Sequence, residues 1–234
     1  RRNWWLGWRP KRWRPLRVFL HSRVKSTERI ERIIMAQAID FYFDFSSPYG
    51  YLAAEKINAL AAKHGRAVNW RPILLGAVFK VNGQKPLTLI PMKDSYAVRD
   101  IARSARFMGL PLTMPSKFPI NGVAPTRAFY WLNEKDAALA QALALACLRA
   151  FFVEDQDISK PETVAAVAKT LGIAEGEILD AMNSDAVKDT TRKAVDAAIT
   201  AGVFGSPYVV VDNEPFWGAD RLDQVARWLE KGPW

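Results

Sequence analysis

The chain has 234 residues, of which 50% are hydrophobic. This length and composition suit one domain, or one domain with an insertion, and exclude a disordered chain. No apolar run reaches the roughly 18 residues that a membrane-spanning helix needs. The net charge of +9 lies entirely in residues 1–34, which hold nine Arg, two Lys and two Glu. The 33 basic and 24 acidic residues of the chain leave 22 of each sign in 35–234, so we expect no nucleic-acid partner for the domain.

Residues 1–34 differ from the rest of the chain in composition. They hold four of the nine Trp, and Pro10 and Pro15 interrupt any helix that could form there. We interpret this segment as an extension, non-native or disordered, that precedes a natural start at Met35. The alternative is an arm for organelle targeting or surface binding. The folded domain is then predicted over 35–234, in a cytoplasmic protein.

The domain opens with a predicted strand, helix and second strand. Residues 38–45 are rich in aromatic side chains with regular polar interruptions, which is typical of a buried strand. Ser47 is a natural N-cap and Pro48 suits the first helical turn, so a helix follows to residue 63. A second strand is predicted over 68–73. Two strands joined by a helix normally pair in parallel.

The other predicted elements follow in chain order: a loop over 76–92, a helix over 93–108, a proline-rich loop, nearly continuous helices over 125–200, a hairpin over 208–217 and a last helix over 220–230. Ser159 to Glu162 reads as a capping box with Pro161 just inside its helix. The order predicts an α/β protein with a thioredoxin-like fold and a large helical insertion at about 93–200, and other α/β folds are the alternative.

Several kinds of site are disfavoured by the residues present. Cys147 is the single cysteine and lies in an apolar run, so we expect a buried core residue. His21 lies in the extension and His64 at the far end of the helix that Ser47 begins, which argues against a Ser-His-Asp triad. The acidic residues of 154–157 are close neighbours without a histidine, which favours a solvated loop over a metal site.

Two segments carry a family resemblance. Residues 40–53 read Asp-Phe-Tyr-Phe-Asp-Phe-Ser-Ser-Pro-Tyr-Gly-Tyr-Leu-Ala, and residues 202–212 read Gly-Val-Phe-Gly-Ser-Pro-Tyr-Val-Val-Val-Asp, followed by Trp-Gly-Ala-Asp-Arg-Leu at 217–222. Together, in this order, they resemble the 2-hydroxychromene-2-carboxylate isomerases. These are close to the kappa-class glutathione transferases, in the DsbA-like thioredoxin superfamily. The likeness extends over nearly all of 36–232.

The resemblance implies that glutathione is the cofactor and that Ser47 is the catalytic serine. It also implies a cis peptide bond at Pro207, which leaves the backbone of Ser206 able to pair with the tripeptide as a short added strand. The hydroxyl of Ser47 would donate to the glutathione sulfur and favour its thiolate, because a hydrogen bond to a charged form stabilises that form.

The resemblance further places the γ-glutamyl-binding pair on Ala219 and Asp220, after Gly218. Relatives often have Ser or Asn at the position of Ala219, so one side-chain hydrogen bond is lost here. The start of the last helix suits the α-carboxylate, and Asp220 suits the α-amino group. Lys93 is expected to bind the glycyl carboxylate. An amide-bearing loop residue falls on Gln84, with Asn82 as the alternative.

The activity that the resemblance implies is a reversible isomerisation of 2-hydroxychromene-2-carboxylate or a similar aromatic α-keto acid. The thiolate adds to a conjugated double bond, the resulting single bond rotates, and glutathione leaves unchanged. Aromatic side chains are the candidates for the substrate pocket: Tyr49, Phe79, Tyr96 and Trp217. The alternative for each of them is core packing. A homodimer is a possible assembly.

There are three rival functions, and the residues present disfavour the third. A kappa-type glutathione transferase would conjugate glutathione permanently, and a non-catalytic thioredoxin-like module would bind without turnover. A thiol–disulfide oxidoreductase needs a Cys-x-x-Cys pair where this chain has Ser47 to Gly50. The simpler alternatives for the site are that Ser47 is only a helix cap, that Asp220 is only an acid at the start of the last helix, and that Lys93 is a solvated lysine.

Overall fold

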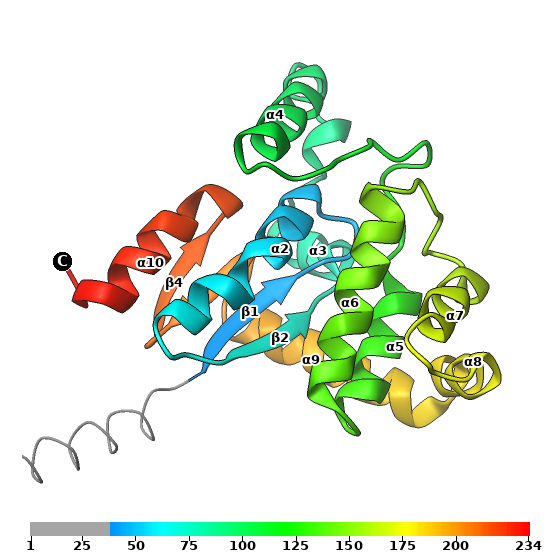
Figure 1. Cartoon of the computed structure of the whole chain (residues 1–234). Helices are drawn as coiled ribbons and strands as arrows, with labels where there is room; N and C mark the ends of the chain where they lie inside the picture. The colour runs from blue at the N-terminus through cyan, green and yellow to red at the C-terminus, as the bar shows by residue number, and fades with distance from the viewer. Residues whose placement is uncertain (1–37) are drawn as a thin grey trace, which may run out of the picture. The chain divides into compact units, whose positions relative to one another are not determined.

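The computed structural model describes residues 38–234, and the predicted extension 1–34 lies outside them (Figure 1). A four-stranded sheet has the order β2-β1-β3-β4. β1 (Ile39–Phe43) pairs in parallel with β2 (Val68–Pro72), as the sequence predicts. β3 (Tyr208–Val211) pairs antiparallel with β1 and with β4 (Glu214–Trp217), which confirms the hairpin.

The alternation of side chains along the strands divides the core between the two faces of the sheet. Phe41 and Phe43 of β1 point to one face, where helices α2 (Pro48–Lys63) and α10 (Leu222–Lys231) pack. Tyr42 points to the other face, against α3 (Leu75–Asn82) and α9 (Asp185–Thr200). Both faces are therefore covered, and the strands hold the ends of α2 and α3 in fixed positions.

The insertion between β2 and β3 is mostly helical, as predicted. After α3 it contains the short 3₁₀ turn η1 (Leu87–Leu89), α4 (Asp94–Phe107), α5 (Val123–Asn133), α6 (Ala137–Phe152), α7 (Pro161–Lys169), α8 (Glu175–Asn183) and α9. Helices α5 to α8 pack together beside β2, whereas α4 stands apart from them at the top of the view (Figure 1). The thioredoxin-like fold with a helical insertion is confirmed.

Three local predictions are wrong. Residues 75–82 form the helix α3 rather than a loop, because Val78 packs against the sheet and the Asp44 carboxylate accepts a hydrogen bond from the first helical N–H, that of Leu75. The capping box at 159–162 does not form. The Ser159 hydroxyl donates to Asp157 instead, and α7 begins at Pro161 without a side-chain cap.

The last helix also begins later than predicted. Residues Ala219–Arg221 form the 3₁₀ turn η2, and α10 follows from Leu222. Asp220 therefore lies in this turn and is not the cap of α10. Within residues 38–234 no helix is both long and apolar enough to cross a membrane.

Candidate active site

Ser47 is the N-cap of α2, as the sequence predicts. Its side-chain oxygen accepts a hydrogen bond of 3.0 Å from the N–H of Gly50, and Pro48 occupies the first turn. The same hydroxyl donates its proton to the carbonyl oxygen of Ser206, 3.0 Å away. Ser47 is only 5% exposed. It therefore joins the start of α2 to the segment that enters β3.

Ser206 lies beside Ser47 and immediately before Pro207. The Ser206–Pro207 peptide bond is cis, which confirms the prediction. The Ser206 hydroxyl accepts a hydrogen bond of 2.9 Å from the N–H of Asp44, at the end of β1. No hydrogen bond among residues 38–234 uses the Ser206 N–H. The backbone of Ser206 thus has one unpaired donor, and one acceptor that a hydroxyl already occupies.

Asp44 is a part of this site that the sequence interpretation missed. Its carboxylate is 2% exposed and accepts from the N–H and hydroxyl of Ser46 and from the N–H of Leu75, each at 2.6 Å. Burial raises the pKa of Asp44, and the hydrogen bonds from Ser46 and Leu75 oppose that shift. An acid between two phenylalanines, just after β1, was the available signal. Its partners lie in separate elements, so the contacts could not be inferred from local pattern.

Two glycines allow the segments to approach this closely. A Cβ at Gly50 would lie 2.8 Å from the Ser206 hydroxyl and 3.1 Å from the Cβ of Ser47. A Cβ at Gly205 would lie 2.3 Å from the indole nitrogen of Trp217. The distances of 2.8 Å at Gly50 and 2.3 Å at Gly205 are below the separation of non-bonded atoms, so any larger residue at either position must displace its neighbours.

The turn before the last helix lies on the β4 side of the site. Gly218 has φ = 115°, and the Asp220 carboxylate folds back so that an added Cβ at Gly218 would lie 2.3 Å from its Oδ1. Asp220 is also paired with Arg221 at 2.8 Å, with both side chains well exposed. Ala219 is buried, which leaves Asp220 as the acid that this turn presents to solvent.

A cavity of about 1300 Å³ brings all the predicted site residues together. Its lining includes Ser47, Gln84, Lys93, Ser206, Pro207 and the turn 218–220. Gln84 and Lys93 are exposed on the far wall, where Lys93 is the N-cap residue of α4. The alternative amide, Asn82, does not line the cavity and instead donates to the Phe204 carbonyl at 3.4 Å.

The four predicted aromatic residues, Tyr49, Phe79, Tyr96 and Trp217, also line this cavity, and none of them is fully buried. Tyr49 donates a hydrogen bond of 2.5 Å to Asp100 of α4, which Tyr96 and Arg103 also contact. The hydrogen bond from Tyr49, followed by that from Arg103, lowers the pKa of Asp100 despite partial burial. Asp100 is a second wall residue that the sequence interpretation missed, and it ties α4 to the start of α2.

One further polar atom in the wall is unusual. The hydroxyl oxygen of Thr88, in η1, is buried and has no hydrogen-bond partner within the described part of the chain. Thr88 lines the same cavity. A buried hydroxyl without a partner costs about 1–3 kcal/mol relative to a paired one.

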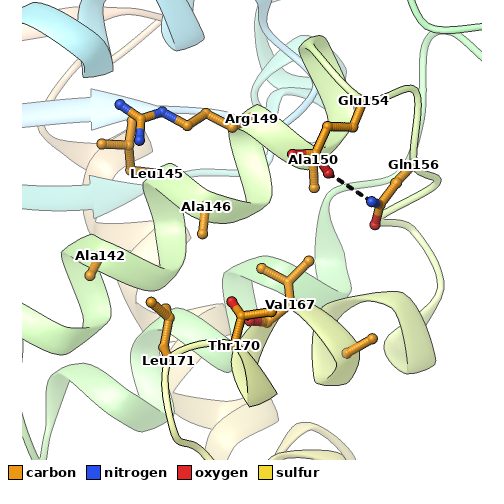
Figure 2. A pocket seen from close by; sticks show the side chains of 11 residues that line it. Ala142, Leu145, Ala146, Arg149, Ala150, Glu154, Gln156, Val167, Thr170 and Leu171 are labelled. Atoms are coloured by element: carbon orange, nitrogen blue, oxygen red, sulfur yellow. Dashed lines mark hydrogen bonds between the residues drawn. The ribbon is translucent and has the colours of Figure 1, made fainter.

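A second cavity lies away from these residues. Figure 2 shows this space of about 530 Å³ between α6 and α7, lined mainly by small and aliphatic side chains such as Ala146 and Val167. Glu154 and Gln156 form a hydrogen bond of 2.8 Å at its edge (Figure 2). None of the predicted site residues lines it, whereas all of them line the larger cavity.

Comparison with known proteins shows the family of the chain. Residues 38–230 match the model of the DSBA-like thioredoxin domain. A 2-hydroxychromene-2-carboxylate isomerase of Sphingobium xenophagum is 30% identical over 198 residues, which cover 83% of this chain and 99% of that protein. The chain belongs to the DSBA-like thioredoxin family, in the group of the 2-hydroxychromene-2-carboxylate isomerases.

A transferase and a solved structure are also similar to this chain. Glutathione S-transferase kappa 1 of Caenorhabditis elegans is 27% identical over 209 residues, covering 82% of this chain and 91% of the transferase. A solved structure of a 2-hydroxychromene-2-carboxylate isomerase superposes with a TM-score of 0.76 at 27% identity, and covers 83% of this chain and 95% of that one. Both groups suggested by the resemblance are therefore recovered.

Proposed function

We propose that this protein is a glutathione-dependent isomerase of 2-hydroxychromene-2-carboxylate or a similar aromatic α-keto acid. The observation that carries the proposal is the hydrogen bond from the Ser47 hydroxyl to the Ser206 carbonyl, in the wall of one large cavity. When bound, glutathione supplies a thiolate that adds reversibly to the conjugated double bond of the substrate.

The donors and acceptors of the cavity suit a short peptide with two carboxylates. The unpaired N–H of Ser206 is available to a peptide added as a strand, and a neighbouring carbonyl lies on the same residue. Lys93 offers a cation at one wall, and Asp220 offers an anion for an α-amino group at the other. We assign Gln84, Pro207, Gly218 and Ala219 to the same binding surface. Pro207 and Ala219 have apolar side chains and shape this surface without donating side-chain hydrogen bonds.

Ser47 is assigned the catalytic role of holding the thiolate. Its hydroxyl can donate to a sulfur, and the first turn of α2 adds a favourable potential for negative charge. Serine as the attacking atom would need an adjacent base. His64 is the C-cap of α2, at the opposite end of the helix, and cannot serve.

Dithiol redox chemistry is disfavoured by the cysteine content. Cys147 is the single cysteine of the sequence and is buried in α6. Burial raises the pKa of its thiol to about 12, so it remains a protonated core residue. The position that a redox cysteine would take, at the head of α2, holds Ser47.

The experiment that tests the function follows 2-hydroxychromene-2-carboxylate and glutathione together. We expect conversion to the ring-opened isomer only when glutathione is present, with its concentration unchanged at equilibrium. Ser47→Ala should lower kcat/KM by about 100-fold or more, because a hydrogen-bond donor aimed at a charged reacting atom is worth this much in other enzymes. Stoichiometric loss of free glutathione would instead establish the rival kappa-type transferase.

Ser184→Ala is the matched control for that variant. Ser184 caps α9 as Ser47 caps α2: its oxygen accepts from the N–H of Val187 at 3.3 Å, and its hydroxyl donates to the Ala181 carbonyl at 2.9 Å. Each substitution should lower the free energy of unfolding by about 1 kcal/mol through loss of the cap. If Ser47→Ala keeps full turnover, as Ser184→Ala should, Ser47 is only a helix cap. If the wild type binds glutathione but shows no turnover, a non-catalytic module becomes the better interpretation.

A further inference from the structure

The Ser47 hydroxyl has one proton, which it donates to the Ser206 carbonyl. A serine hydroxyl donates one hydrogen bond and accepts up to two. Ser47 accepts from the Gly50 N–H and donates to the Ser206 carbonyl, both at 3.0 Å. A thiolate that also requires this proton competes with the Ser206 carbonyl for it. The proposed catalytic role therefore depends on what happens to that carbonyl.

The backbone of Ser206 needs a partner on both of its polar groups. In an antiparallel pair, two facing residues exchange both N–H···O=C hydrogen bonds. The N–H of Ser206 is unpaired within residues 38–234, and its carbonyl is paired through Ser47. A peptide that adds a strand here supplies a carbonyl to that N–H and an amide N–H to that carbonyl, which makes the Ser47 proton redundant at Ser206.

We propose, building on the glutathione-dependent function above, that the Ser206 carbonyl selects the thiol: it releases the Ser47 hydroxyl to a thiolate only when the ligand provides an amide N–H in exchange. A thiol without that amide leaves the carbonyl dependent on Ser47, since a part-buried carbonyl that loses its donor is destabilised. The chemical class that the site activates is therefore a cysteinyl peptide, and simple alkyl thiols are excluded.

The surroundings let the proton move without moving the oxygen. The Gly50 N–H holds the Ser47 oxygen at the start of α2, so only the O–H bond has to rotate. The Ser206 hydroxyl is held separately by the N–H of Asp44 at 2.9 Å, which keeps the backbone at 206 in place during the exchange. The proton of the ligand thiol passes to solvent, and no bond between heavy atoms forms or breaks.

The test compares glutathione with its ester analogue, in which the amide N–H between the γ-glutamyl and cysteinyl units is replaced by oxygen. The thiol of each bound ligand is titrated through thiolate absorbance near 240 nm, at saturating protein, with the wild type and with Ser47→Ala. For glutathione we expect the substitution to raise the thiol pKa by about one to two units, the value of a hydrogen bond to a charged group. For the ester analogue we expect no change.

Comparing the wild type with Ser47→Ala removes the contribution of α2, which both proteins share. 2-Mercaptoethanol is a second probe and should behave as the ester analogue does. An equal effect of Ser47→Ala on the ester analogue and on glutathione would overturn the inference and leave the proposed function standing. If glutathione fails to bind, or if its thiol titrates alike in both proteins, the role of Ser47 in the proposed function falls as well.

Discussion

The two walls of the large cavity are built in different ways. The wall around Ser47 is buried and interlocked: Asp44 is 2% exposed and Ser47 is 5% exposed, and both bond to Ser206 from a distant part of the sequence. The opposite wall consists of η1 and α4, where Lys93 is exposed and Tyr96 is 61% exposed. A hydrogen bond from Tyr49 to Asp100 joins this second wall to the first.

This difference between the walls separates two functions: positioning a reactive atom and contacting a ligand. Buried and mutually bonded groups hold a reactive atom in one position, because leaving any of them unpaired is costly. Exposed charges such as Lys93 can contact a ligand while contributing little to the stability of the fold. Substitutions in the first wall should therefore change stability and chemistry together, whereas substitutions in the second should change binding alone.

The largest effect on stability is expected from Asp44→Ala. The substitution leaves the donors of Ser46 and Leu75 without their buried acceptor, and we expect a loss of about 3 kcal/mol in the free energy of unfolding, measured with urea. Asp220 belongs to an exposed ion pair with Arg221, so Asp220→Ala should change the free energy of unfolding by less than about 0.5 kcal/mol. Similar values for the two variants would remove the distinction between buried and exposed acids.

Gly205→Ala should have the next largest effect. The new Cβ would lie 2.3 Å from the Trp217 indole nitrogen, so the ring must move. Overpacking of this kind costs about 1–3 kcal/mol. Trp217 fluorescence should shift as well, because the ring leaves its contact with Phe204. Gly176→Ala, at a glycine with open space around its Cβ, is the control and should leave fluorescence unchanged.

Tyr49→Phe tests the connection between the walls. The hydroxyl of Tyr49 is the largest cause of the lowered pKa of Asp100, so the substitution should raise that pKa toward its ordinary value, as carboxyl NMR would show. A carboxyl with a depressed folded-state pKa stabilises the protein above its unfolded pKa of about 3.9, and this stabilisation is lost as the pH falls through the folded value. The wild type should exceed the variant by about 1 kcal/mol at pH 7, and the difference should shrink below about pH 4. A difference that is constant with pH would show that Asp100 is not involved.

The smallest structural effect is expected from Lys93→Ala. This exposed lysine lies at the start of α4, and its loss should leave the unfolding free energy unchanged. Glutathione affinity, measured by calorimetry, should fall about fivefold, as the loss of an exposed charge contact of about 1 kcal/mol implies. Lys80→Ala on α3, outside the cavity lining, should leave affinity unaltered. Equal affinities of the two variants would exclude Lys93 from the binding surface.

The same division explains what the sequence could predict. The Ser47 cap and the parallel strands follow from local patterns, since the N-cap and the alternation are read over a few residues. Helix α3 was missed because its stability comes from Asp44 and from packing on the sheet, not from its own short, glycine-containing sequence. The hydrogen bond between Asp44 and Ser206 joins residues 162 positions apart, and no local pattern reports such a contact.

The family resemblance supplied the residues that local patterns could not. Pro207 and the turn 218–220 were placed by it, and the structure brings them to the same cavity as Ser47. Asp100 was missed because it depends on how α4 is oriented, which neither its helical periodicity nor the two motifs define.

The most direct measurement of the central claim is the pH titration of thiolate absorbance for glutathione bound to the wild type, Ser47→Ala and Ser184→Ala. We predict a thiol pKa below the free value of about 8.5 in the wild type and in Ser184→Ala, and a return toward that value in Ser47→Ala alone. A Ser47→Ala complex that titrates like the wild type would contradict the claim that Ser47 stabilises the glutathione thiolate.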